Sequence, residues 1–252
     1  MGETQQAVAD GLLFSIIMPA YNEQDVIADT VDALCTHLNG ASHRYEVIIV
    51  DDASSDDTAN IIAELAQRHD AVRGLHNGGP NGYGHAIRRG LDVYKGDAAV
   101  VVTSDGADLP KDVVAYFDKI TEGYDCAFGE RFGRGSTVTG YPPVKKVINR
   151  LANRLLGWIA GGRGYRDFTN GFKCYRRHVI DDMQPLEAGQ FNITIEMSLK
   201  AVLAGHSFAV VPNDWQQRDA GQSSFNVARL IKPYFATMIF CLARNYLRGI
   251  KR

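Results

Sequence analysis

Short apolar runs alternate with stretches of helical periodicity along most of the chain. The runs are rich in valine and isoleucine and are bounded by turn residues, which is typical of strands buried on both faces in a parallel sheet. We predict strands over 14–19, 45–50, 71–76, 98–103, 125–128, 168–175 and 207–211. We predict helices over 24–38, 85–94, 111–121, 143–159 and 193–203, and one more with Asp56 as its N-cap. This alternation predicts an α/β fold with a mostly parallel central sheet flanked by helices.

The C-terminal part of the chain has a different pattern. Apolar residues recur at helical spacing over 227–247, and Pro233 interrupts them, so we expect a break there. Residues 226–252 hold six basic side chains and no acidic one, and we treat them as a basic amphipathic helical tail after a domain of residues 1–225. Such a tail can lie in a membrane interface. It can equally pack on the domain or on a second copy of the chain, and the sequence leaves these alternatives open.

The composition is that of a folded domain. The chain has 252 residues, of which 45% are hydrophobic, enough for one large core. Its four cysteines have no metal-ligand spacing, so we expect buried thiols in a reducing compartment. Residues 1–10 are polar and are predicted to be disordered, and we expect no signal peptide because a basic segment followed by an apolar one is missing there. No apolar run reaches the ~20 residues that a spanning helix needs.

The charge is unevenly distributed. The net charge is −2, yet the segment 131–177 contains eleven lysines and arginines and a single acid, Asp167. Basic segments on a mildly acidic protein indicate a phosphate-bearing partner or an anionic membrane surface. The alternative is a pair of solvated helix faces, which so high a local charge makes less favourable.

The strand predicted over 98–103 is followed by two carboxylates, Asp105 and Asp108, three positions apart. The ends of parallel strands point into the ligand crevice of an open α/β sheet, and Gly106 lets the backbone approach a ligand closely. Two hard oxygen donors at this place suit Mg²⁺ or Mn²⁺ carried on a diphosphate. The alternative is a structural role, with Asp108 capping the helix that begins near Pro110. Taken alone, these residues favour the two roles about equally.

Other strand ends carry groups that fit a nucleoside diphosphate. The first strand ends in Pro-Ala-Tyr-Asn-Glu at 19–23, and the second ends in Asp51-Asp52, where a carboxylate can accept a hydrogen bond from a ribose hydroxyl or a base amine. We expect the strand 168–175 to return over this site. The glycine-rich loop 78–84 precedes a helix but lacks the spacing of a phosphate-binding loop, so we expect a turn that packs near the site. Together these positions predict a nucleotide site with a metal on the diphosphate.

Several of these stretches resemble a known family. Pro-Ala-Tyr-Asn-Glu at 19–23 and Val-Asp-Asp-Ala-Ser-Ser-Asp-Asp-Thr at 50–58 resemble family 2 glycosyltransferases, which have the Rossmann-like GT-A fold. Gly-Glu-Arg-Phe at 129–132, Thr-Asn-Gly-Phe at 169–172 and the loop around Arg218 make the chain most similar to the dolichol-phosphate mannosyltransferase-like group, which acts on polyprenyl phosphates. The similarity extends through most of the chain.

The resemblance implies roles for particular positions. Nucleotide binding is assigned to Pro19, Ala20, Tyr21, Glu23, Val50, Asp52 and Gly106. The catalytic positions are Asp105, Arg131 and Arg218, the metal ligands are Asp105 and Asp108, and the acceptor-phosphate contacts are Lys145 and Asn149. The family places its second metal-binding acid two residues after the first, where this chain has Ala107, so Asp105 is the stronger metal candidate. The chain also has Ser223-Ser224 where the family often has Ser-Lys.

The resemblance implies an inverting, metal-dependent transfer of a sugar from a UDP- or GDP-sugar to a polyprenyl phosphate, either dolichyl or undecaprenyl. Mg²⁺ or Mn²⁺, together with Arg218, would stabilise the departing diphosphate. A lipid monophosphate is ionised at neutral pH and needs no general base. A saccharide hydroxyl acceptor would need one, for which Asp167 and Glu196 are the candidates.

The alternative to an enzyme is a module that binds a nucleotide sugar without catalysing a reaction. We expect the protein in the cytoplasm, held peripherally at the cytoplasmic face of a membrane by its tail. A second copy of the chain is a further candidate partner, and no nucleic acid is expected.

Overall fold

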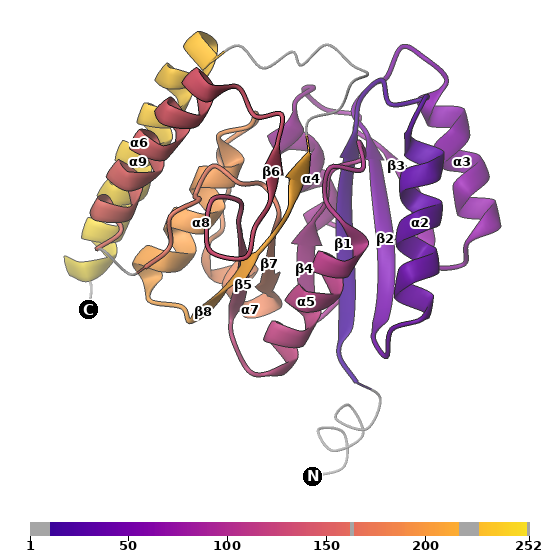
Figure 1. The fold of residues 1–252 in the computed structure, drawn as a ribbon, viewed down its shortest axis with the longest axis horizontal. Helices are drawn as coiled ribbons and strands as arrows, with labels where there is room; N and C mark the ends of the chain where they lie inside the picture. Colours follow the sequence, from indigo (N-terminus) through magenta and orange to yellow (C-terminus); the bar gives the residue numbers. More distant parts are fainter. Residues whose placement is uncertain (1–10, 162–163, 217–226, 251–252) are drawn as a thin grey trace.

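The computed structural model describes residues 11–161, 164–216 and 227–250. Seven strands form one sheet in the order β3-β2-β1-β4-β7-β5-β8 (Figure 1). They are β1 (Leu13–Ala20), β2 (Arg44–Asp51), β3 (Val72–His76), β4 (Ala98–Val101), β5 (Cys126–Glu130), β7 (Lys173–Arg176) and β8 (Phe208–Pro212). β7 is antiparallel to both of its neighbours, whereas the other pairs are parallel. The predicted mostly parallel α/β sheet is therefore confirmed.

Helices cover both faces of the sheet. α2 (Ile27–Asn39), α3 (Thr58–Arg68) and α5 (Pro110–Thr121) share one core with Phe14, Ile16 and Met18 of β1. α4 (Tyr83–Leu91), α7 (Arg177–Asp182), α8 (Ile193–Ala204) and α9 (Val227–Ile250) share the other core with Ile17. Alternate residues of β1 thus feed opposite cores, as expected of a strand buried on both faces. α6 (Pro143–Ile159) and the short parallel pair of β6 (Val138–Thr139) and β9 (Trp215–Gln216) complete the elements.

Two strands differ from the prediction. The predicted strand 98–103 ends at Val101, because the N–H of Thr103 donates to the carboxylate of Asp108 at 2.8 Å instead of joining a ladder. The predicted strand 168–175 begins only at Lys173 and lies inside the sheet, between β4 and β5, rather than over the site. The residues before it form a turn, in which the N–H of Asn170 donates to the carbonyl of Asp167 at 3.0 Å.

The break expected at Pro233 does not occur, and α9 runs through it. A proline costs a helix one internal hydrogen bond. Packing along α8 compensates for it: the side chain of Asn192 donates to Thr237 Oγ1 at 2.8 Å, and Met238 and Cys241 are buried in the core. The division of the chain at 225/226 stays a prediction.

The composition led to expectations about the cysteines and about membrane-spanning helices. All four cysteines are buried free thiols, as predicted. Among the described residues, no helix combines the length and the low polarity that crossing a membrane requires.

Candidate active site

The strand ends at one edge of the sheet, and the loops that follow them, hold the predicted nucleotide and metal positions together with Arg131. β1, β2, β4 and β5 end at this edge, and the antiparallel β7 begins there (Figure 1). The loops after β1 and β2 are locked together, because the side-chain oxygen of Asn22 accepts the N–H of Ser55 at 2.7 Å and the N–H of Asn22 donates to Ser54 Oγ at 3.0 Å. Asn22 adopts φ 54°, a left-handed conformation that asparagine tolerates.

The predicted nucleotide-binding positions on β1 and β2 fall into two groups. Pro19, Ala20 and Val50 are buried within paired strands, so a ligand could meet only their backbone. Tyr21 lies just beyond the strand end with 57% of its surface exposed. The N–H of Glu23 donates to Thr58 Oγ1 at 2.8 Å, which links the start of α2 to the start of α3.

Asp52 fixes the glycine-rich loop. Its two carboxylate oxygens accept hydrogen bonds from the side chain of Asn77 and from the N–H of Gly82, each at 2.7 Å. Gly82 has φ 150°, and a Cβ there would collide with Gly189 and Gln190, so this turn requires glycine. The loop therefore packs near the site, as predicted, and Asp52 is the residue that positions it.

Asp105 and Asp108 lie in the loop after β4. Asp105 Oδ1 accepts the N–H of Ala107 at 3.0 Å, and Gly106 takes the left-handed conformation that closes this turn, φ 69°. Asp108 does not cap α5; its Oδ2 accepts the N–H and the hydroxyl of Thr103 at 2.8 and 3.0 Å. Burial raises the pKa of Asp108 to about 7, and the charge of Asp105 adds to this shift. Because the charge of Asp105 disfavours a charge on Asp108, a divalent cation bound by the two carboxylates would offset this repulsion.

Arg131 follows β5 and is held by Asp167. Its Nε and Nη2 donate to the two carboxylate oxygens at 2.9 and 2.8 Å, and its backbone N–H donates to the same carboxylate at 3.0 Å. Nη2 also donates to Thr169 Oγ1 at 3.2 Å. The remaining nitrogen, Nη1, makes no hydrogen bond with the described residues. The ion pair therefore fixes the guanidinium and leaves one edge for a phosphate.

Three aromatic residues that the sequence did not single out complete this site. Tyr83 stacks on Phe191 with ring centroids 4.6 Å apart. Burial and the neighbouring charges of Asp108 and Asp105 raise the pKa of the Tyr83 hydroxyl above its usual range. Tyr234 of α9 donates to the carbonyl of Phe191 at 3.3 Å, which brings the C-terminal helix to the site. These contacts join segments far apart in the chain, so no local pattern predicts them.

The turn before β7 connects the site to α6. The side chain of Asn149 donates to Thr169 Oγ1 at 2.8 Å, whereas Lys145, the other predicted acceptor contact, makes no hydrogen bond with the described residues. Lys173 is buried below this turn, where its ammonium donates to the carbonyls of Phe168 and Asn170. Burial lowers the pKa of Lys173 to about 7. Arg218, the remaining predicted catalytic residue, lies outside the described residues.

A groove of about 960 Å³ opens beside Arg131. Its walls come from α6, from the segment 130–134 at the end of β5 and from the segment 164–166. Glu130 and Phe132, the two neighbours of Arg131, line it. Its cationic lining consists of Arg134, Arg150, Arg154 and Arg166. None of these four forms an ion pair with a described residue. Val147 and Leu151 add an apolar wall, so the groove combines apolar surface with four arginines and one carboxylate, that of Glu130, on which the charges of Arg166 and Arg150 act.

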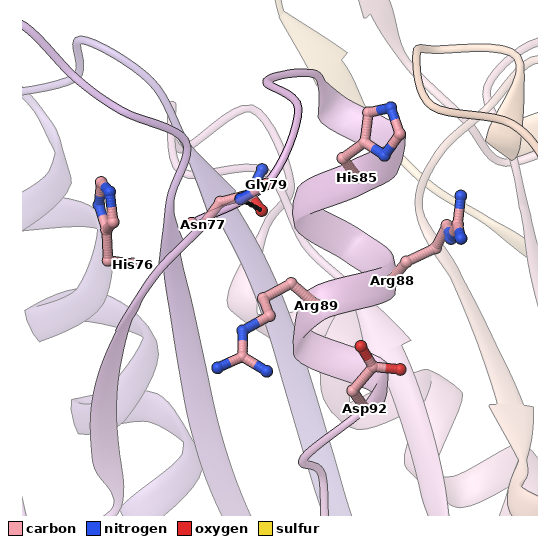
Figure 2. A pocket seen from close by; sticks show the side chains of 8 residues that line it. His76, Asn77, Gly79, His85, Arg88, Arg89 and Asp92 are labelled. Carbon is pink, nitrogen blue, oxygen red and sulfur yellow. Dashed lines mark hydrogen bonds between the residues drawn. The ribbon is translucent and has the colours of Figure 1, made fainter.

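A smaller pocket of about 390 Å³ lies between the end of β3 and α4. His76, which contacts Asp51 at 3.0 Å, borders it together with three basic residues of α4. Figure 2 shows that Arg89 points from α4 toward the strand end that carries His76, whereas Arg88 and His85 point to the other side. The pocket is thus cationic, but its basic groups do not converge on one point.

Comparison with known families agrees with this geometry. The family model described as glycosyl transferase family 2 matches residues 15–184, which contain the ends of β1, β2, β4 and β5. The chain belongs to glycosyl transferase family 2. As a member of this family, it is a glycosyltransferase, and the predicted resemblance is confirmed.

Two curated relatives are similar to the chain over most of its length. The chain is 27% identical over 226 residues to polyprenol monophosphomannose synthase from Mycolicibacterium smegmatis, covering 87% of this chain and 83% of the relative. It is 28% identical over 242 residues to undecaprenyl-phosphate 4-deoxy-4-formamido-L-arabinose transferase from Klebsiella pneumoniae, covering 93% of this chain and 68% of the relative.

Solved structures agree on the fold. Glucosyl-3-phosphoglycerate synthase from Mycobacterium tuberculosis in complex with UDP superposes with a TM-score of 0.67 at 19% identity, covering 96% of this chain and 84% of the other. The same enzyme with Mn²⁺, UDP-glucose and phosphoglyceric acid superposes with a TM-score of 0.68. Both structures of that enzyme hold a uridine nucleotide on this fold, and the second also holds Mn²⁺.

Proposed function

We propose that this glycosyltransferase transfers a sugar from a nucleoside diphosphate sugar to a polyprenyl phosphate, with inversion at the anomeric carbon. An oxygen of the lipid phosphate forms a bond to the anomeric carbon while the bond from that carbon to the donor diphosphate breaks. The nucleoside diphosphate leaves with the bonding electron pair. The names of the two curated relatives support this acceptor class, and the groove beside Arg131 is the structural observation that carries it.

The donor half of the site fits a metal-bound diphosphate. The oxygen donors of Asp105 and Asp108 suit Mg²⁺ or Mn²⁺, with Asp105 as the main ligand because Asp108 is engaged by Thr103. A bound divalent cation supplies charge stabilisation to the leaving diphosphate. Arg131, oriented by Asp167, adds a fixed guanidinium edge whose positive charge also acts on Asp108. Arg218 stays a proposed phosphate contact.

The acceptor half fits a lipid phosphate. Its headgroup would meet the four unpaired arginines, and its first isoprene units would lie against Val147 and Leu151. Arginine is the side chain best suited to bind phosphate through two donors at once. We therefore propose Arg150 and Arg154 of α6, which line the groove, as acceptor contacts in addition to Lys145 and Asn149.

A saccharide hydroxyl acceptor would need a general base, and both candidate carboxylates are engaged in other contacts. Asp167 is occupied by three donors of Arg131, and its side chain is 1% exposed. Glu196 is fully buried in α8, pairs with Lys200 and accepts the N–H groups of Glu187 and Ala188. Neither carboxylate is positioned to remove a proton from a substrate. A phosphate acceptor, which needs no such step, is favoured.

Exposed apolar side chains on α6 support docking to a membrane surface. The helix exposes Val144, Val147, Ile148, Leu151, Leu155 and Trp158, of which Trp158 is 78% exposed. α9 exposes Phe235, Ile239 and Leu247. Both helices lie on the left flank of the molecule in Figure 1. Because Val147 and Leu151 also line the groove, a lipid could pass from the membrane interface to the site along one apolar surface.

The acceptor assignment is tested by removing two groove arginines together, Arg150→Gln and Arg154→Gln. We expect the KM for a short polyprenyl phosphate to rise at least about tenfold, since each lost charged hydrogen bond weakens binding by about that factor. The KM for the nucleotide sugar should stay unchanged. The matched control is Arg88→Gln with Arg89→Gln on α4, which removes the same charge elsewhere. Equal effects of both pairs, or an unchanged acceptor KM, would contradict the groove assignment.

A further inference from the structure

A cluster of histidines and aspartates lies at the opposite edge of the sheet from the candidate active site. Asp125 directly precedes β5, whereas Arg131 follows it, so the length of this strand, roughly 17 Å, separates the two places. Figure 1 shows α7, which contributes to the cluster, at the edge where the parallel strands begin. The catalytic reaction makes no use of these residues.

The ligating atoms of three side chains converge there. One atom each from Asp125, His178 and His206 lies within 4.8 Å of the others. His178 Nε2 is 3.1 Å from Asp125 Oδ1, and His206 Nε2 is 3.1 Å from a carboxylate oxygen of Asp182. The residues come from three places in the fold: the start of β5, α7 and the connection from α8 to β8.

The surrounding hydrogen bonds orient the central carboxylate. Asp125 Oδ2 accepts the N–H and the hydroxyl of Ser207 at 2.9 and 2.7 Å, which turns Oδ1 toward the ring of His178. A carboxylate that is oriented by hydrogen bonds from neighbouring groups is the arrangement that supports metal ligands in proteins.

We propose that Asp125, His178 and His206 form a binding site for a zinc-class transition metal ion. Two imidazoles and one carboxylate match the ligand set of Zn²⁺ and exclude a preference for Mg²⁺ or Ca²⁺. In tetrahedral Zn²⁺ sites the ligand atoms are about 3.3 Å apart, so side-chain rotations alone can close the cluster. A water or Asp182 takes the fourth position. The ion would tie α7 to the starts of β5 and β8, and its role is structural.

The test uses the full chain without an affinity tag and with excess Mg²⁺. Titration calorimetry with ZnCl₂ should show one site per chain, and Zn²⁺ at a hundredfold excess over its Kd should raise the Tm by about 5 to 10 °C. His178→Ala, at a side chain that is 56% exposed, should keep the fold and weaken Zn²⁺ binding by about 100-fold or more. Ser207→Ala should weaken it by about 10- to 100-fold.

Two controls locate the site. His69→Ala removes a histidine that also pairs with an aspartate, Asp32, at 2.6 Å, and it should leave Zn²⁺ binding unchanged. Asp105→Asn should also leave it unchanged. The absence of Zn²⁺ binding would overturn the proposal. So would equal binding by His178→Ala and the unmodified chain, or loss of binding in Asp105→Asn, which would place the ion at the active site.

Discussion

The ion pair of Arg131 with Asp167 gives the sharpest prediction about the site. In Asp167→Asn, one oxygen can still accept from Nη2, but an amide replaces the oxygen that accepts from Nε and from the backbone N–H. Two buried donors then lose their acceptor, and the guanidinium loses its counter-charge. Breaking a buried pair in this way costs about 3 to 5 kcal/mol of unfolding free energy. In a chain of this size that corresponds to a fall in Tm of roughly 6 to 20 °C.

Urea unfolding followed by circular dichroism measures this cost. The matched control is Asp32→Asn, which removes a partly exposed carboxylate that pairs with Arg68 at 2.5 Å and with His69 at 2.6 Å, and it should cost no more than about 1 kcal/mol per pair. Because the loss arises from one pair, adding Arg131→Met to Asp167→Asn should cost less than the sum of the single changes. An Asp167→Asn variant as stable as the unmodified chain would refute the argument.

The remaining predictions concern metal, pH and membrane. Asp105→Ala should lower metal-dependent transfer by at least about 100-fold, and full activity at saturating Mn²⁺ would contradict the metal assignment. Lys173 has a pKa of about 7 when folded, so between pH 7 and 10 the unfolded chain binds a proton that the folded chain has released. The free energy of unfolding, relative to Lys173→Met, should therefore rise by about 1.4 kcal/mol per pH unit, and a flat difference in urea titrations would disprove it. Leu155→Ser with Trp158→Ser should reduce sedimentation with anionic vesicles at least about tenfold, whereas Tyr124→Ser, which removes an exposed aromatic side chain outside α6 and α9, should not.

The sequence predicts most of this fold because hydrophobic periodicity is a local signal. The helix predicted over 143–159 matches α6 at both ends, and β1, β2 and β8 differ from their predicted bounds by at most one residue. The failures have non-local causes. Pro233 continues a helix because packing on α8 compensates for its lost hydrogen bond. Residues 168–172 form a turn rather than a strand because the N–H of Asn170 donates to the carbonyl of Asp167, and the Asn170 side chain donates to the carbonyl of Gly129 and to Asn213.

The candidate site was predicted in part for the same reason. Asp105 was predicted because strand ends are visible in a sequence and their arrangement in a parallel sheet is known, whereas Arg131 was predicted only from the resemblance of residues 129–132 to the family. Asp52 was also found, but its role in fixing the glycine-rich loop depends on contacts with Asn77 and Gly82 that only the fold creates. The arginines on α6 were seen only as part of a charged segment, since the groove that selects Arg150 and Arg154 exists only in the folded chain.

The central claim is that the acceptor is a polyprenyl phosphate. The most direct test incubates the purified chain and Mg²⁺ or Mn²⁺ with a panel of UDP- and GDP-sugars, with and without a short polyprenyl phosphate, and follows release of the nucleoside diphosphate. We predict release that requires both the metal and the lipid phosphate, with formation of a glycosylated lipid phosphate. Equally fast release without the lipid, or transfer to a saccharide hydroxyl in its place, would contradict the account.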